Sequence, residues 1–186
     1  MKRIAIALLL LSLMLPTVSL AYDNGSVRGS FDPRIASGRL NQEMVTRTGP
    51  GTEYTSLGTI GYEGQWVDVY SITYDRNGVA WAQVSAEVNG LPVRVYTGLK
   101  RIDGVDMNYV SRDSNYNEVV HTRRASRPSF GPGYHYAGYN FILPEYTEVR
   151  IIQIERDEMT DECFTACDFY YNGDWRRGWF PSDIIP

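Results

Sequence analysis

Two glycine-rich phrases hold the side chains best placed to bind a ligand. Residues 47–54 read RTGPGTEY and residues 127–136 read RPSFGPGYHY, and each Gly-Pro-Gly is followed three residues later by a tyrosine. Proline and glycine favour tight turns, so the phrase is either a turn that the fold needs twice or the base of a site. The candidate ligand-binding residues at these loops are Arg47, Glu53, Tyr54, Tyr134, His135 and Tyr136.

A second candidate cluster follows the Asn172-Gly173 turn signal. Trp175 stands there beside Arg176 and a further arginine, where side chains are usually exposed. An arginine over a tryptophan ring forms a cation–π contact with or without a ligand. We therefore add Trp175 and Arg176 to the candidate ligand-binding residues.

The residue patterns of known catalytic sites are missing from the sequence. It has two histidines, His121 and His135, which form no zinc-binding pattern with the cysteines. It also has no Gly-x-Ser-x-Gly elbow, phosphate loop or dinucleotide-binding fingerprint. We expect a non-enzymatic protein with no catalytic residues, no metal and no cofactor.

Cys163 and Cys167 are the only cysteines. An even number of cysteines in an exported protein is first interpreted as a disulfide, so we predict that these two are bonded. A metal site is the alternative, because Asp157, Glu158, Asp161 and Glu162 lie just upstream.

The N-terminus predicts export. Lys2 and Arg3 precede an apolar run over residues 4–15, and the run is followed by Ser19-Leu20-Ala21. This is the pattern of a cleaved Sec-type signal peptide, and its apolar run is shorter than the ~20 residues that span a bilayer. We expect a secreted or periplasmic protein with no membrane anchor in the mature chain.

The charge of the mature chain argues against a nucleic-acid partner. Removing Lys2 and Arg3 from the 18 basic residues leaves 16 against 22 acidic ones, a net charge of −6. Proteins that bind nucleic acid are usually basic.

The chain repeats itself at an offset of 82 to 83 residues. Both Gly-Pro-Gly phrases, the Asn-Gly pairs at 89–90 and 172–173, and Arg94 with Arg177 align in order. Val67 and Val69 alternate with polar or aromatic neighbours, as in a half-buried strand, and the Asn-Gly pairs indicate hairpins. Short strands with tight turns predict an all-β fold of two small antiparallel β-barrels in tandem. The expected core residues are Leu57, Ile60, Val67, Val69, Trp81, Val84, Ile142, Val149, Ile151 and Trp179.

Each copy resembles the bacterial Src-homology-3 domain. The resemblance rests on RTGPGTEY, on the Val-x-Val strand after GQW, on Trp81-Ala82-Gln83-Val84, and above all on the closing phrase GWFPSDII. It implies SH3-like barrels that bind a cell-wall peptide or peptidoglycan in an aromatic-lined groove beside the Gly-Pro-Gly loop. The loop tyrosines could instead only brace their loops. If both loops bind, they are not expected to bind the same ligand.

Trp66 and Tyr70 are predicted on the outer face of their strand, because Val67 and Val69 point inward. They are the interface candidates, either toward the other barrel or toward an envelope protein. The alternative function is therefore a protein–protein adaptor or a structural component of the cell envelope, and the protein is expected to be a monomer. The predicted division is signal peptide 1–21, flexible arm 22–38, first barrel 39–103, linker 104–120 and second barrel 121–186.

Overall fold

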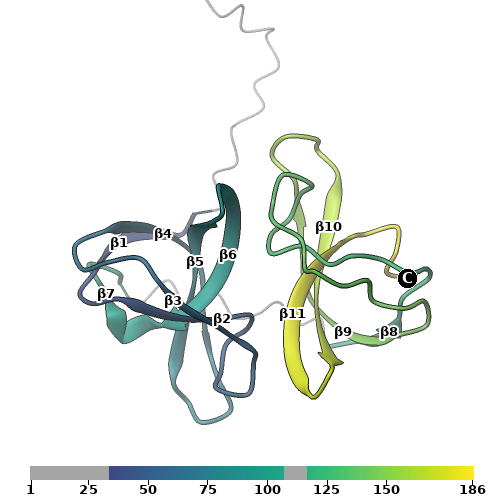
Figure 1. Cartoon of the computed structure of the whole chain (residues 1–186), viewed down its shortest axis with the longest axis horizontal. Helices are drawn as coiled ribbons and strands as arrows, with labels where there is room; N and C mark the ends of the chain where they lie inside the picture. The colour runs from purple at the N-terminus through teal and green to yellow at the C-terminus, as the bar shows by residue number, and fades with distance from the viewer. Residues whose placement is uncertain (1–33, 107–116) are drawn as a thin grey trace, which may run out of the picture. The chain divides into compact units, whose positions relative to one another are not determined.

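A computed structural model describes residues 34–106 and 117–186 (Figure 1). The predicted signal peptide lies outside these residues, as do most of the predicted arm and the centre of the predicted linker. The described chain is all-β, as predicted, and consists of a seven-stranded and a four-stranded antiparallel sheet. Both sheets curl into barrel-like folds, one from each copy of the repeat.

The first sheet has the strand order β3-β2-β6-β5-β4-β1-β7. A short 3-10 helix over Leu99–Arg101 leads from β6 into β7. The strands are β1 (Ala36–Leu40), β2 (Met44–Arg47), β3 (Ser56–Ile60), β4 (Trp66–Tyr74), β5 (Ala80–Val88), β6 (Leu91–Gly98) and β7 (Ile102–Asp103).

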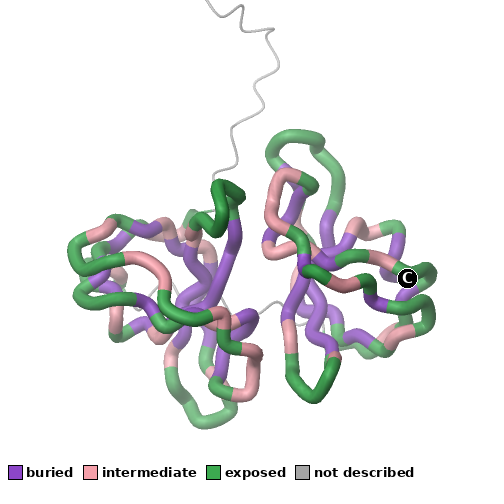
Figure 2. The backbone as a smooth tube through the Cα atoms, in the orientation of Figure 1, coloured by how far each residue is buried: buried purple, intermediate pink, exposed green. Residues whose placement is uncertain are grey.

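The core of this sheet confirms the period-two pattern. Val67, Val69 and Val84 are buried inside it and lie on the inner faces of β4 and β5. Figure 2 colours the buried stretches of the backbone purple. Leu57 and Ile60 are partly buried and pack against the same cluster.

The second sheet has the strand order β11-β10-β9-β8. Its strands are β8 (Val119–His121), β9 (Glu148–Arg156), β10 (Cys163–Tyr171) and β11 (Asp174–Pro181). Val149 and Ile151 lie in its core, as predicted, but Ile142 does not. Ile142 is 57% exposed, and its neighbour Leu143 is fully buried in the core. Residues 141–143 lie outside any strand, so the repeat alignment could not fix which side chain points inward.

Both predicted Asn-Gly hairpins are present. Asn89 and Gly90 have φ of 53° and 77°, and Asn172 and Gly173 have φ of 52° and 91°. Two successive residues with positive φ match the type I′ turn, whose twist suits antiparallel strands. These turns join β5 to β6 and β10 to β11, and they fix the register of both hairpins.

Two predicted segment boundaries differ from the strands. β1 begins at Ala36, within the predicted arm, and β8 begins at Val119, within the predicted linker. Gly38 explains why β1 belongs to the sheet, because a Cβ there would lie 2.4 Å from Ile102 Cγ2. The glycine lets β7 approach β1 closely.

The predicted disulfide is wrong. Both cysteines are free, with Cys163 exposed and Cys167 buried. They lie in one extended strand, β10, where four residues span about 13 Å. A disulfide joins Cα atoms that are usually within about 7 Å. The segment between the cysteines belongs to the first strand of the β10–β11 hairpin, so its extended backbone keeps the two thiols apart.

Candidate functional site

The two Gly-Pro-Gly loops have the same internal packing. A Cβ on Gly49 would lie 2.1 Å from Tyr54 Cδ1, and a Cβ on Gly131 would lie 2.2 Å from Tyr136 Cδ1. Each tyrosine ring therefore lies against the glycine five residues before it. Tyr54 and Tyr136 brace their loops, which is the structural role that the sequence left open.

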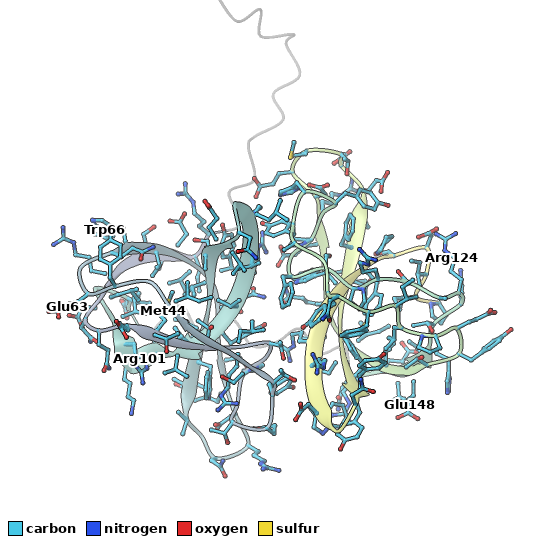
Figure 3. The ribbon with its side chains drawn as sticks, viewed as in Figure 1. Met44, Glu63, Trp66, Arg101, Arg124 and Glu148 are labelled. Atoms are coloured by element: carbon cyan, nitrogen blue, oxygen red, sulfur yellow. The ribbon has the colours of Figure 1, made fainter. Side chains whose placement is uncertain are left out.

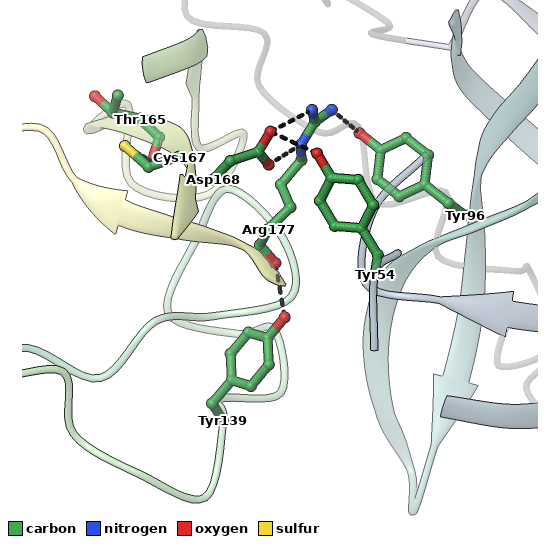
Figure 4. Close-up of polar contacts among 7 residues, drawn as sticks. All are labelled: Tyr54, Tyr96, Tyr139, Thr165, Cys167, Asp168 and Arg177. Carbon is green, nitrogen blue, oxygen red and sulfur yellow. Dashed lines mark hydrogen bonds and ion pairs between the residues drawn. The ribbon is translucent and has the colours of Figure 1, made fainter. Parts of the chain in front are cut away.

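Tyr54 also contacts the second sheet (Figure 4). Its hydroxyl donates to Asp168 Oδ2 at 2.7 Å, and the Arg177 guanidinium holds both oxygens of that carboxylate, at 2.7 and 3.0 Å. Arg177 also donates from Nη1 to the hydroxyl of Tyr96 at 2.9 Å. Burial raises the pKa of Tyr54 far above its ordinary value, so the hydroxyl keeps its proton and remains a donor.

Tyr136 of the second barrel makes the corresponding contact with the first barrel. Arg94 donates from Nε to the Tyr136 hydroxyl at 3.2 Å and from Nη1 to Glu155 Oε2 at 2.6 Å. The Arg94 guanidinium also lies 3.9 Å from the centroid of the Tyr70 ring. Tyr70 therefore stacks on the arginine that reaches the second barrel, although Tyr70 and Arg94 both belong to the first barrel.

These contacts relate the copies by an approximate twofold arrangement. Arg94 and Arg177 occupy equivalent positions of the repeat, and each reaches the loop tyrosine of the other copy. Backbone hydrogen bonds between the copies show the same symmetry. Thr55 N donates to Trp175 O and Ala137 N donates to Pro92 O, both at 3.0 Å. The copies thus use the same surface toward each other, as in a symmetric dimer. Sequence reasoning aligned both arginines and placed Arg177 in the cluster beside Trp175, but it predicted for neither a contact with the other copy.

Trp66 lies elsewhere. Its side chain projects from β4 (Figure 3), is 63% exposed, and has the Arg39 guanidinium 5.2 Å from its ring centroid. The two predicted interface candidates therefore separate. Tyr70 is used within the chain and Trp66 remains at the surface.

A groove opens beside the second Gly-Pro-Gly loop. It has a volume of about 390 Å³ and is walled by Tyr134, Tyr136, Phe164 and Trp179. The Tyr134 ring is 64% exposed and meets Phe164 edge to face, with centroids 5.2 Å apart. The remaining residues of the lining are Ser126, Arg127, Ser129, Gly133, Gly138 and Pro181.

One substitution between the copies bears on this groove. Ser129 stands two residues before its Gly-Pro-Gly, and Arg47 holds the same position in the first copy. Arg47 Nη1 crosses its own loop to the carbonyl oxygens of Thr52 and Tyr54, at 3.0 and 2.7 Å. Ser129 Oγ is shorter and reaches the carbonyl oxygens of Gly131 and Trp179, at 2.7 and 3.3 Å. The short side chain leaves the space of the groove free, whereas the arginine spans the equivalent loop.

Glu53 and His135 hold equivalent loop positions and do not line the groove. A Cβ on Gly51 would lie 2.3 Å from Glu53 Oε2, so this carboxylate packs over the loop. The His135 ring lies 4.4 Å from that of Tyr136, and its Nδ1 is 3.5 Å from Asp157 Oδ1.

Trp175 and Arg176 point to opposite faces of β11, as successive strand residues do. Trp175 meets Tyr170 on the outer face, with centroids 5.6 Å apart, while Arg176 stacks over Phe141 at 5.4 Å. The eight predicted ligand-binding residues therefore do not form one site, and only Tyr134 and Tyr136 lie in the groove.

The acidic turn after β9 is organised by its own chain. Asp157 is buried and accepts hydrogen bonds from Met159 N at 3.0 Å and Thr160 Oγ1 at 2.9 Å. Among the described residues, no group of three or more histidine, cysteine, aspartate or glutamate side chains is placed to hold a metal.

The chain matches no protein-family model and no curated protein sequence. In residues 34–106 and 117–186, no helix has the length and apolar character needed to cross a membrane.

Proposed function

We propose that the protein is an exported, non-catalytic binding protein that holds a cell-wall peptide in the groove beside the second Gly-Pro-Gly loop. The observation that carries this proposal is the aromatic wall of the groove, where the exposed Tyr134 ring stands against the buried Phe164. The signal-like N-terminus and the resemblance to bacterial Src-homology-3 domains support the compartment and the ligand class. The first Gly-Pro-Gly loop has a structural role in this proposal.

The dimensions and chemistry of the groove suit a short peptide. Its volume of about 390 Å³ lies in the range of small-ligand pockets, which combine apolar walls with a few polar groups. Arg127 is exposed at the groove and offers a planar fork to a peptide carboxylate. The aromatic walls supply contact area with little loss of side-chain entropy.

The test is retention of the purified protein on purified peptidoglycan. Tyr134→Ala removes the exposed wall, and we expect it to weaken binding about fivefold or more, the usual effect at an aromatic hot spot. Ser129→Arg should abolish retention by filling the groove. Arg47 shows that the fold accepts arginine at the equivalent position.

Tyr74→Ala is the matched control. Tyr74 is 49% exposed at the end of β4 and lies outside the groove lining. Its variant should bind as the unmodified protein does, and melting curves should show that all variants remain folded. If the unmodified protein is not retained, or if folded Ser129→Arg protein is retained normally, the groove is not a peptidoglycan site.

Trp66 supports a second candidate function, that of an adaptor for an envelope protein. A tryptophan that is 63% exposed on a regular strand is unusual, and tryptophan is enriched at interface hot spots. Site-specific photo-crosslinking from position 66 in intact cells tests this function. A discrete crosslinked protein that is lost on Arg39→Ala would support it, and the absence of any adduct would exclude it.

A further inference from the structure

The outer face of the second sheet carries a second group of polar and aromatic side chains. In the register of β8 to β11, Val119 is opposite Arg150, Arg150 is opposite Asp168, and Asp168 is opposite Arg177. A neighbouring row has His121 opposite Glu148 on one pair of strands and Tyr170 opposite Trp175 on the other. Because strand side chains alternate, these residues share the face opposite the core.

One end of this face forms a pocket of about 240 Å³. The polar and aromatic residues of its lining are Glu148, Arg150, Asp168, Tyr170 and Trp175. Glu148 lies at the surface in Figure 3. This pocket shares no lining residue with the groove of the second Gly-Pro-Gly loop.

The charged side chains of this pocket differ in whether they have partners within the protein. The Asp168 carboxylate is buried and already bound by Arg177 and Tyr54. The side chains of Glu148 and Arg150 are exposed, and in the described part of the chain neither makes a hydrogen bond or ion pair. They stand two residues apart on one face of β9, so a negative and a positive group point to the same side about 7 Å apart at the backbone.

The aromatic pair completes the pocket. Tyr170 is 57% exposed and Trp175 is 38% exposed, and their rings meet edge to face. Exposed aromatic faces attract a cation, tryptophan most strongly. Arginine binds a carboxylate through two parallel hydrogen bonds.

We propose that this pocket binds a zwitterionic amino-acid group. Its ammonium lies between Glu148 and the faces of Trp175 and Tyr170, and its carboxylate pairs with Arg150. A volume of about 240 Å³, below the usual range for drug-sized ligands, accommodates one such group rather than a longer peptide. The group has two sources, a free amino acid or the free amino and carboxyl end of a diamino-acid side chain within a peptide. This proposal does not depend on the function proposed for the groove.

The test is an NMR titration of the isotopically labelled protein with alanine, N-acetylalanine and alaninamide. Alanine should shift the signals of Tyr170 and Trp175 at concentrations up to about 10 mM, the weak affinity expected of so small a ligand. Each blocked derivative lacks one charge and should bind at least about fivefold more weakly, because each charge-assisted contact contributes to affinity. A peptide whose only zwitterionic group is on a diaminopimelate side chain distinguishes the two sources.

Charge-neutral variants assign the two contacts. Glu148→Gln should weaken binding of alanine and remove the preference over N-acetylalanine, and Arg150→Gln should remove the preference over alaninamide. Glu145→Gln and Arg123→Gln are matched controls at exposed positions outside the pocket and should change nothing. Ser129→Arg, which fills the groove, should also leave alanine binding intact.

Two results would overturn the proposal. One is the absence of shifts with both alanine and the diaminopimelate peptide, and the other is equal binding of alanine and its blocked derivatives. Loss of peptidoglycan retention in the groove variants would not affect it, so the two proposals fail separately.

Discussion

Single residues decide what the repeated Gly-Pro-Gly phrase does in each copy. Gly49 and Gly131 have the same role, since each provides room for a tyrosine ring where a Cβ would overlap it. The position two residues before the phrase differs, with Arg47 spanning one loop and Ser129 leaving the other open. The conserved part of the phrase thus builds the loop, and the part that varies between the copies shapes the groove.

Gly131→Ala is expected to destabilise the protein by about 1–3 kcal/mol, the usual cost of inserting a methyl group into a packed site. The added Cβ would overlap the Tyr136 ring, which Arg94 holds in place from the other barrel. Gly98→Ala is the control, because a Cβ there meets no atom within 4 Å and its φ is −61°. Chemical denaturation compares the two variants. An equal effect of both would contradict the packing role of Gly131.

At the scale of elements, hairpins were predictable because their signals are local. The Asn-Gly turns and the Val67-Val69 alternation each follow from a few adjacent residues, and both were confirmed. The cysteines were misinterpreted because compartment and spacing say nothing about whether the segment between them is extended. Ile142 was misplaced because an alignment with few identities carries no register outside strands.

The groove could be predicted only in part. The resemblance indicated the loop, and Tyr134 and Tyr136 were named from it. Phe164 was not among the predicted site residues, and Trp179 was predicted only as a core residue. The contacts made by Arg94 and Arg177 depend on how the copies meet, which the sequence of either copy does not specify.

The position of the cysteines along β10 predicts unequal thiol reactivity. Cys163 is exposed and should react with a maleimide in the folded protein, whereas Cys167 is buried and its pKa is raised by that burial. Mass spectrometry should find one label on the native protein and two after denaturation without reductant. A native protein that takes up no label, together with a denatured one that needs reductant to react, would instead indicate a bond between them.

At the scale of the whole molecule, the two copies bury charged groups in their contact. The side chains of Arg94, Asp168 and Arg177 are all less than 10% exposed, and each has a charged or hydroxyl partner. A buried ion pair adds little net stability over apolar packing but is costly to break, because one charge is then left without a partner. Such a contact favours one arrangement of the two barrels, because other arrangements would leave a buried charge without a partner.

This contact predicts that the described parts of both barrels unfold together. Chemical denaturation should show a single transition, with tryptophan fluorescence and circular dichroism coinciding.

Arg177→Met leaves Asp168 buried without its guanidinium and should lower the free energy of unfolding by about 3–5 kcal/mol. Tyr96→Phe removes the hydroxyl that accepts a hydrogen bond from Arg177 of the other barrel and should cost about 1.5–3 kcal/mol, the usual value for a hydrogen bond to a charged group. Arg76→Met, at an exposed turn of the first barrel, is the control and should change stability by less than about 0.5 kcal/mol. Two separate transitions in the unmodified protein, or an Arg177→Met protein as stable as the control, would show that the barrels do not stabilise each other.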